Sequence, residues 1–224
     1  MSDSYNPLQV VVWGDFACFT RPELKAERVS YPMMTPSAAR GVLEAIFWKP
    51  EFRWAVRQIH VLRPHSGVDT WGTNFYRHFS IMRNEIGKRA TGDPISLGDE
   101  GVRQQRHTLA LRDVAYLIRA DVKVRPGVAE DPAKYRDQFQ RRVRKGQCFH
   151  RPYLGCREFA AYFAPPEGDE EQRRFRHSEP IDLGLMLLDI VHSADGDSTP
   201  IFFPARLEDG ILNVKGELYE RFGP

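Results

Sequence analysis

The pattern of hydrophobic and polar positions along the chain predicts where strands and helices lie. A run of β-branched residues at 8–13 ends at Gly14 and predicts a buried strand. Residues 35–49 carry apolar side chains at helical spacing, with Thr35 able to cap the first turn and Pro50 ending the run, so they predict a helix. Polar and apolar positions alternate or mix in three later segments, which predicts strands at 54–62, 108–124 and 157–163.

A second helix is predicted at 131–145. Asp131 precedes Pro132 as a capping residue, and the last turn carries the cations of RRVRKG, which complement the negative end of a helix. The six elements follow the order strand–helix–strand–strand–helix–strand, which is that of the ferredoxin-like fold of RNA-recognition modules. Between the second and third strands, residues 63–102 are rich in Gly, Asn, Asp and Pro, and we expect a functional or partly disordered loop there.

The last part of the chain has a different pattern. A charged, turn-rich stretch follows residue 164, and an Asp-Gly turn at 209–210 separates the last two of three short predicted strands, at 183–192, 201–207 and 210–215. We therefore predict an α+β protein with a ferredoxin-like N-terminal domain at 1–164 and a small C-terminal antiparallel β-sheet domain at 165–224.

The composition bounds the class of protein. A chain of 224 residues with 42% hydrophobic residues can bury a core. No apolar run approaches the roughly 20 residues that cross a bilayer, and no secretory signal is visible, so we expect no membrane partner. The three cysteines are too few and too scattered for a disulfide framework, which favours a cytoplasmic setting. Because Cys148, His150 and Cys156 fall short of four zinc ligands, we expect no metal and no cofactor.

Charge is distributed unevenly. Residues 1–164 carry 26 Lys and Arg against 17 Asp and Glu, or +9, whereas residues 165–224 carry 6 against 13, or −7. A basic body suits a polyanionic partner, because each neutralised phosphate releases counterions. The distribution favours nucleic acid, although cations scattered over a solvated surface would give the same count.

The tripeptide Gln105-Arg106-His107 is the first candidate for chemistry. A neutral imidazole has a pKa of about 6.5 and suits proton transfer, and a neighbouring guanidinium stabilises charge on a phosphate. Together they could cleave RNA without a metal, by attack of a ribose 2′-hydroxyl on the adjacent phosphorus. The same pair is also typical of a surface or capping histidine.

Three sequence blocks resemble one known family. They begin at Trp13, Arg103 and Arg151 and read WGDFACFTRPELKAERVSYPMMTPSAARGVLEAIFWKP, RQQRHTLALRDVAYLIRADV and RPYLGCREFAAYF. They resemble the CRISPR-associated protein 5 family, in particular the subtype I-C members that process CRISPR precursor RNA. The resemblance implies a metal-independent endoribonuclease that binds CRISPR repeat stem-loops and leaves a 2′,3′-cyclic phosphate and a 5′-hydroxyl. It also implies that the protein keeps the 5′ handle within a type I-C antiviral surveillance complex.

The resemblance also implies which residues act. The family uses a tyrosine on the first helix and a Lys-His pair before the long strand, and these positions read Phe47 and Arg106-His107 here. Arg106 keeps the positive charge but cannot donate a proton at working pH, and Phe47 has no hydroxyl. Tyr31 or Tyr76 could supply one instead.

The family places bound RNA beside the segment between the first strand and the first helix. We therefore expect phosphate contacts from four cations, which could otherwise be solvated side chains: Arg21, Lys25, Arg28 and Lys49. The implied partners are precursor and mature CRISPR RNA and the other subunits of the complex, with duplex DNA as a possible further ligand. Two alternatives stay open: a non-cleaving subunit of the same fold that caps the 5′ handle, which the phenylalanine at position 47 favours, and a scaffold that meets acidic proteins.

Overall fold

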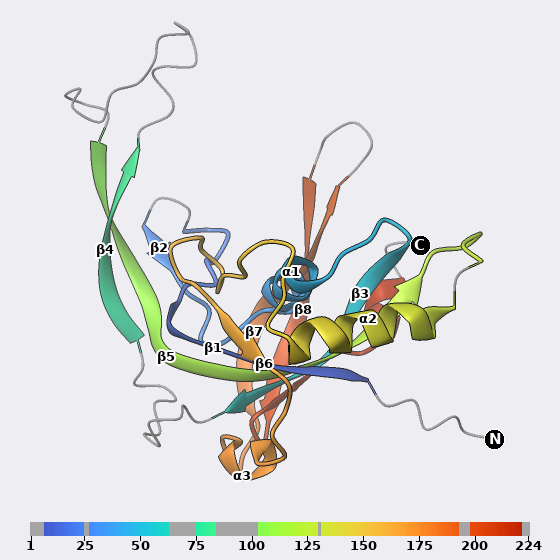
Figure 1. Cartoon of the computed structure of the whole chain (residues 1–224). Coiled ribbons are helices and arrows are strands. Elements are labelled where there is room, and N and C mark those ends of the chain that lie inside the picture. The colour runs from blue at the N-terminus through green and yellow to red at the C-terminus, as the bar shows by residue number, and fades with distance from the viewer. Residues whose placement is uncertain are drawn as a thin grey trace, which may run out of the picture.

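A large, mainly antiparallel sheet runs through the molecule, and the two long helices lie on one side of it (Figure 1). The computed structural model describes residues 7–24, 27–62, 75–83, 103–129, 131–192 and 198–220, and only the backbone of residues 75–83, 103–106 and 192. In the described part of the chain the strands follow the order β6-β1-β5-β3-β9-β8-β7, and β2 and β4 also pair with β5. The strands are β1 (Leu8–Ala17), β2 (Arg28–Val29), β3 (Phe52–Leu62), β4 (Phe75–Arg83), β5 (Arg103–Val124), β6 (Tyr162–Ala164), β7 (Ile181–His192), β8 (Ser198–Glu208) and β9 (Ile211–Asn213).

Both predicted helices are confirmed, and their caps are those that the sequence indicates. Helix α1 (Pro36–Ile46) begins after Thr35, whose hydroxyl accepts a hydrogen bond from the Ala38 amide at 3.2 Å. Helix α2 (Pro132–Arg144) begins after Asp131, whose carboxylate accepts from the Ala133 amide at 2.9 Å. Two single-turn helices, α3 (Glu170–Arg173) and α4 (Glu217–Glu220), follow later in the chain.

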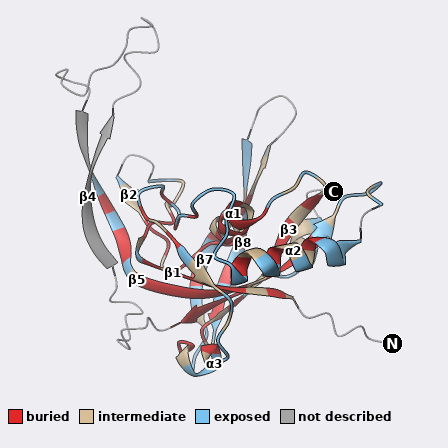
Figure 2. Cartoon of the chain, viewed as in Figure 1, coloured by how far each residue is buried: buried red, intermediate tan, exposed pale blue. Residues whose placement is uncertain are grey.

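The core lies between the sheet and these two long helices. Figure 2 shows α1 buried in the middle of the molecule, whereas α2 exposes one side. Aromatic rings from β3 and α2 fill the space between them, with ring centres 4.7 Å apart for Trp54 and Phe139 and 5.1 Å apart for Phe52 and Tyr135. Such edge-to-face and tilted pairs add to the gain from burying apolar area. These contacts hold α2 against β3.

The long strand β5 has two halves with different partners. Its inner half lies between β1 and β3, while its outer half pairs with β4 and stands away from the body as a ribbon (Figure 1). Asp113, between the two halves, has a φ of 56°, in the left-handed region that Asp tolerates better than most residues. The loop expected at 63–102 was therefore partly wrong, because residues 75–83 form β4. The rest of that range lies outside the described residues.

The strands predicted from residue 157 onward are confirmed to different extents. Only the end of the strand expected at 157–163 forms, as β6, because Leu154 and Phe159 close a local turn in which the Leu154 amide donates to the Phe159 carbonyl at 2.8 Å. The three strands predicted near the C-terminus are confirmed as β7, β8 and β9. The fold is thus a mixture of a large antiparallel sheet and a few helices.

The strands after residue 164 continue the sheet of the first part. β9 pairs with β3, and the carboxylate of Asp189 on β7 receives Arg40 of α1 and Arg53 of β3, each at 2.8 Å. The division into domains at 1–164 and 165–224 stays a prediction. Among the described residues, no helix is long and apolar enough to cross a membrane.

Candidate functional site

His107 lies on the outer half of β5, where three strands meet. Its backbone is opposite Phe79 of β4, and the short strand β2 runs parallel to β5 with Arg28 opposite Thr108. The side chain of His107 is exposed, and its backbone amide donates a hydrogen bond to Glu27 at 2.8 Å. A shallow pocket of about 350 Å³ is lined here by Glu27, Arg28, Val29, His107, Thr108 and Leu109. His107 and Arg28 therefore both line this pocket, on the neighbouring strands β5 and β2.

Arg28 is held in this pocket by contacts from a distant loop. Its Nη1 donates to Glu158 at 2.8 Å and lies 3.4 Å from the sulfur of Cys156. The hydrogen bond with Cys18, together with the charge of Arg28, lowers the pKa of Cys156 to about 7, while that hydrogen bond and burial raise the pKa of Cys18. Glu158 thus supplies the negative charge that orients Arg28, and the sulfur of Cys156 is a second, weaker acceptor.

The remaining predicted cations are placed differently. Arg21 lies over the ring of Tyr31, 4.8 Å from its centre, and 3.8 Å from the carboxylate of Glu23. Lys49 is partly exposed just after α1. Lys25 and the side chain of Arg106 lie outside the described residues.

Phe47 is a core residue in this structure. It is 1% exposed, its ring centre is 5.4 Å from that of Phe52, and its carbonyl oxygen accepts a hydrogen bond from the Trp54 indole at 2.9 Å. Phe47 is not among the described residues that line the His107 pocket. The structure therefore places Arg28 and His107 in the lining of one pocket, and Phe47 outside its described lining.

Of the two alternative tyrosines, Tyr31 does not occur among the described residues that line this pocket. Tyr31 is buried, and burial raises the pKa of its hydroxyl. The side chain of Tyr76 lies outside the described residues. No group of three or more potential metal ligands occurs among the residues that the structure describes.

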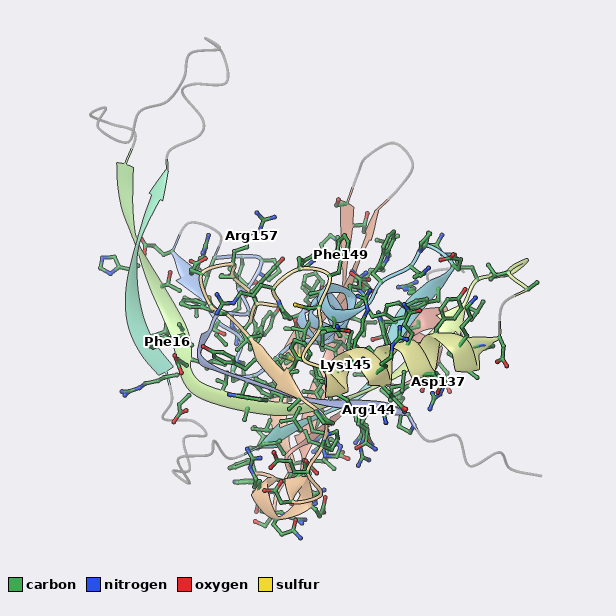
Figure 3. The ribbon with its side chains drawn as sticks, in the orientation of Figure 1. Phe16, Asp137, Arg144, Lys145, Phe149 and Arg157 are labelled. Carbon is green, nitrogen blue, oxygen red and sulfur yellow. The ribbon has the colours of Figure 1, made fainter. Side chains whose placement is uncertain are left out.

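A second basic pocket was not anticipated from the sequence. It has a volume of about 430 Å³ and is lined by His150, Arg151, Pro152, Tyr153 and Arg157. Figure 3 shows Phe149 and Arg157 on the side of the molecule that carries α1. The signal was present in the third resembling block, RPYLGCREFAAYF, where arginines alternate with aromatic residues. Glu27, which holds the His107 backbone, had no such signal because it acts across 80 residues of chain.

Comparison with known proteins assigns this fold to a class. A solved structure described as a CRISPR-associated protein covers 95% of this chain and 94% of its own, with a TM-score of 0.64 and 22% identity, a likeness that shows the fold. The family model described as CRISPR-associated protein (Cas_Cas5) matches residues 8–215, and the chain therefore belongs to the Cas5 family.

Two relatives are similar over nearly their whole length. A protein of Thermus thermophilus named CRISPR pre-crRNA endoribonuclease Cas5d is 47% identical, over 95% of this chain and 93% of the relative. A protein of the same name from Mannheimia succiniciproducens is 41% identical, over 93% of this chain and 95% of the relative.

Proposed function

We propose that this chain is a metal-independent endoribonuclease that binds CRISPR repeat stem-loops and cuts precursor CRISPR RNA. The observation that carries the proposal is the identity of 47% and 41%, over almost the full chain, to relatives named CRISPR pre-crRNA endoribonuclease Cas5d. A shared fold alone would not support an activity, because one fold serves many functions. The exposed side chain of His107, which lines the same pocket as Arg28, supports the same conclusion from the site itself.

The chemistry needs one base, one acid and positive charge. A base removes the proton of the ribose 2′-hydroxyl, the oxygen attacks phosphorus, and the bond from phosphorus to the 5′-oxygen breaks as an acid protonates that oxygen. The products are a 2′,3′-cyclic phosphate and a 5′-hydroxyl. His107 exchanges one of these protons, and Arg106 and Arg28 stabilise the charge that develops on the phosphate.

The RNA is bound by cations that follow β1 and α1 in the chain, and it is retained after the cut. Arg21, Lys25, Arg28 and Lys49 contact phosphates, and specificity comes from the shape of the stem-loop and from its single-stranded flanks, since the A-form major groove excludes side chains. The strand order β6-β1-β5-β3, with α1 joining β1 to β3 and α2 joining β5 to β6, supports a ferredoxin-like arrangement for this part of the chain.

The protein then stays on the 5′ handle within a type I-C surveillance complex in the cytoplasm. Its partners are the other subunits and the mature CRISPR RNA, with duplex DNA as a further ligand for the basic surface. The acidic segment 165–224 faces solvent or a basic neighbour, because like charge keeps it from the RNA.

One experiment tests the activity. Repeat RNA is incubated with the protein in EDTA, alongside His107→Gln and an RNA with a 2′-deoxy sugar at the cut. We expect the wild type to cut once and leave a cyclic phosphate, identified by mass spectrometry, while both controls bind without being cut. Cleavage that persists with the deoxy substrate would contradict attack by the 2′-oxygen.

A second function is favoured by one observation. Phe47 lacks a hydroxyl and is buried, which suits a subunit that caps the 5′ handle without cleaving it. Tight binding of repeat RNA by the wild type, with no product in EDTA or in Mg²⁺, would select this alternative.

A further inference from the structure

The loop of residues 148–157, which we call the 148–157 loop, is held in place by the core. The amides of Phe149 and His150 both donate to the carbonyl oxygen of Ala45, at 2.8 and 3.2 Å. Near its other end, Leu154 is fully buried and accepts a hydrogen bond from the Cys18 amide at 3.0 Å. The loop is therefore fixed at both ends to α1 and β1, and it presents the side chains between them in a defined arrangement.

Positive charge collects in the pocket of about 430 Å³ that this loop forms. The described lining includes two arginines and a histidine and no carboxylate. Among the described residues, neither Arg151 nor Arg157 has a carboxylate within 4.0 Å, and both side chains are exposed. Glu158, the nearest acid along the chain, is already bound to Arg28. The pocket thus has cationic groups with unused capacity for an anion.

Aromatic faces lie beside these cations. Phe149 is 76% exposed and Tyr153 is 37% exposed, and the ring of His150 meets Phe149 edge-on with 5.8 Å between their centres. Exposed aromatic rings interleaved with arginines are typical of surfaces that bind single-stranded nucleic acid, where bases stack on rings and guanidinium groups bind phosphates. The volume is within the range of roughly 300–1,000 Å³ for small-ligand sites. An acidic peptide would use the arginines but leave the rings without a partner.

The loop is connected to the candidate cleavage pocket. Arg157 lies between Cys156 and Glu158 in the chain, and both of these neighbours contact Arg28, which lines the His107 pocket. The loop and the His107 pocket are therefore neighbours, joined through the side chain of Arg28.

We propose that the 148–157 loop is a subsite for an unpaired nucleotide of the RNA, with its base stacked on Tyr153 or Phe149 and its phosphate bound by Arg151 and Arg157. This subsite rests on the proposed function and assigns the single-stranded flank proposed there to a defined place on the surface.

The test measures the contribution of the Tyr153 ring and that of the Arg157 charge separately. Binding of repeat RNA and of its single-stranded flank is measured by fluorescence anisotropy over a range of salt concentrations. We expect Tyr153→Leu to weaken binding about tenfold, since stacking of one base contributes on that scale, and Tyr153→Phe to bind as the wild type does. We expect Arg157→Gln to reduce the log–log salt slope by about 0.7, the value for one phosphate of a single strand.

The controls are an exposed tyrosine and an exposed arginine outside the loop. Tyr162→Leu on β6 and Arg206→Gln on β8 should leave the affinity and the slope unchanged. If the wild type binds and cuts repeat RNA while Tyr153→Leu and Arg157→Gln behave as these controls do, the subsite is overturned and the proposed function stands. If the wild type does not bind repeat RNA at low salt, both are overturned. If polyglutamate displaces repeat RNA from the wild type and Tyr153→Leu has no effect on RNA binding, the loop binds acidic proteins and the subsite is overturned.

Discussion

The guanidinium of Arg142 lies over the ring of Phe47, with its central carbon 5.2 Å from the ring centre. The same side chain donates a hydrogen bond to the carbonyl oxygen of Ile46 at 2.8 Å. Because Ile46 ends α1, helix α2 supplies the cation that stabilises the free carbonyls of α1. The position at which the family has a tyrosine is therefore enclosed between the two helices in this chain.

Phe47→Tyr should not improve catalysis. The added hydroxyl would be buried among Phe52 and Arg142, away from the described lining of the His107 pocket. A buried hydroxyl without a partner costs about 1–3 kcal/mol. We expect the free energy of unfolding in urea to fall by that amount, with a single-turnover cleavage rate that stays within about twofold of the wild type. The control is Phe202→Tyr, at a ring that is 39% exposed, which should change neither quantity. A large gain in rate for Phe47→Tyr would mean that position 47 reaches the substrate.

Arg28 and Glu158 should affect RNA binding in opposite directions. Their 2.8 Å ion pair, on a partly exposed surface, competes with any phosphate for the same guanidinium. Arg28→Ala should weaken binding of repeat RNA and lower its salt dependence, whereas Glu158→Gln should tighten binding at low salt. Filter binding at several salt concentrations measures both effects. Weaker binding by Glu158→Gln would show that the ion pair positions Arg28 for RNA instead of competing with it.

The sequence predicted those parts of the fold that depend on local interactions. Thr35 and Asp131 are residues whose side chains cap the next turn, so the helix starts could be found without tertiary information. The alternation at 108–124 likewise marked a strand with one covered face. β4 was missed because it lies within a long stretch rich in Gly, Asn, Asp and Pro, and among the described residues it pairs with the outer half of β5 alone.

The candidate site was predicted only in part, since its geometry depends on contacts between distant residues. His107 and Arg28 were identified separately, but their proximity follows from the two-residue strand β2, which is too short for any periodicity. The partners of Arg28 lie 128 and 130 residues away. Glu27 and Glu158 therefore had no signal in the sequence, and neither did the separation of Phe47 from the His107 pocket.

Gly155→Ala should be far more damaging than Gly127→Ala. Both glycines have left-handed backbones, with φ of +82° and +84°, so both substitutions carry a similar conformational cost of about 1–2 kcal/mol. A methyl group at position 155 would collide with the Cys18 carbonyl oxygen, whereas nothing lies within 4 Å at position 127. The difference in urea midpoints between the two variants measures this close approach. Equal midpoints would mean that the 148–157 loop moves away from β1 easily, and the loop could not then present a fixed subsite.

The stability of the fold should depend on pH through His60. This histidine on β3 is 3% exposed, with its Nε2 3.2 Å from the Gln58 side-chain oxygen. Burial, aided by the charges of Arg119 and Arg174, lowers the pKa of His60 to about 4. Above its ordinary value of 6.5 the imidazole is neutral in both states and makes no difference. As the pH falls from 6.5 towards 4, His60 binds a proton in the unfolded chain but not in the folded chain, so the free energy of unfolding decreases.

The size of this effect is bounded, and a matched variant isolates it. One group changes the free energy of unfolding by at most about 1.4 kcal/mol per pH unit. We expect urea midpoints between pH 7 and pH 5 to fall less steeply for His60→Gln, which keeps a polar group beside Gln58 and cannot titrate. His177→Gln, at an exposed histidine, should keep the wild-type slope. Parallel slopes for the wild type and His60→Gln would mean that the buried imidazole is protonated without opening the sheet, and that its surroundings admit water more readily than the packing of β3 indicates.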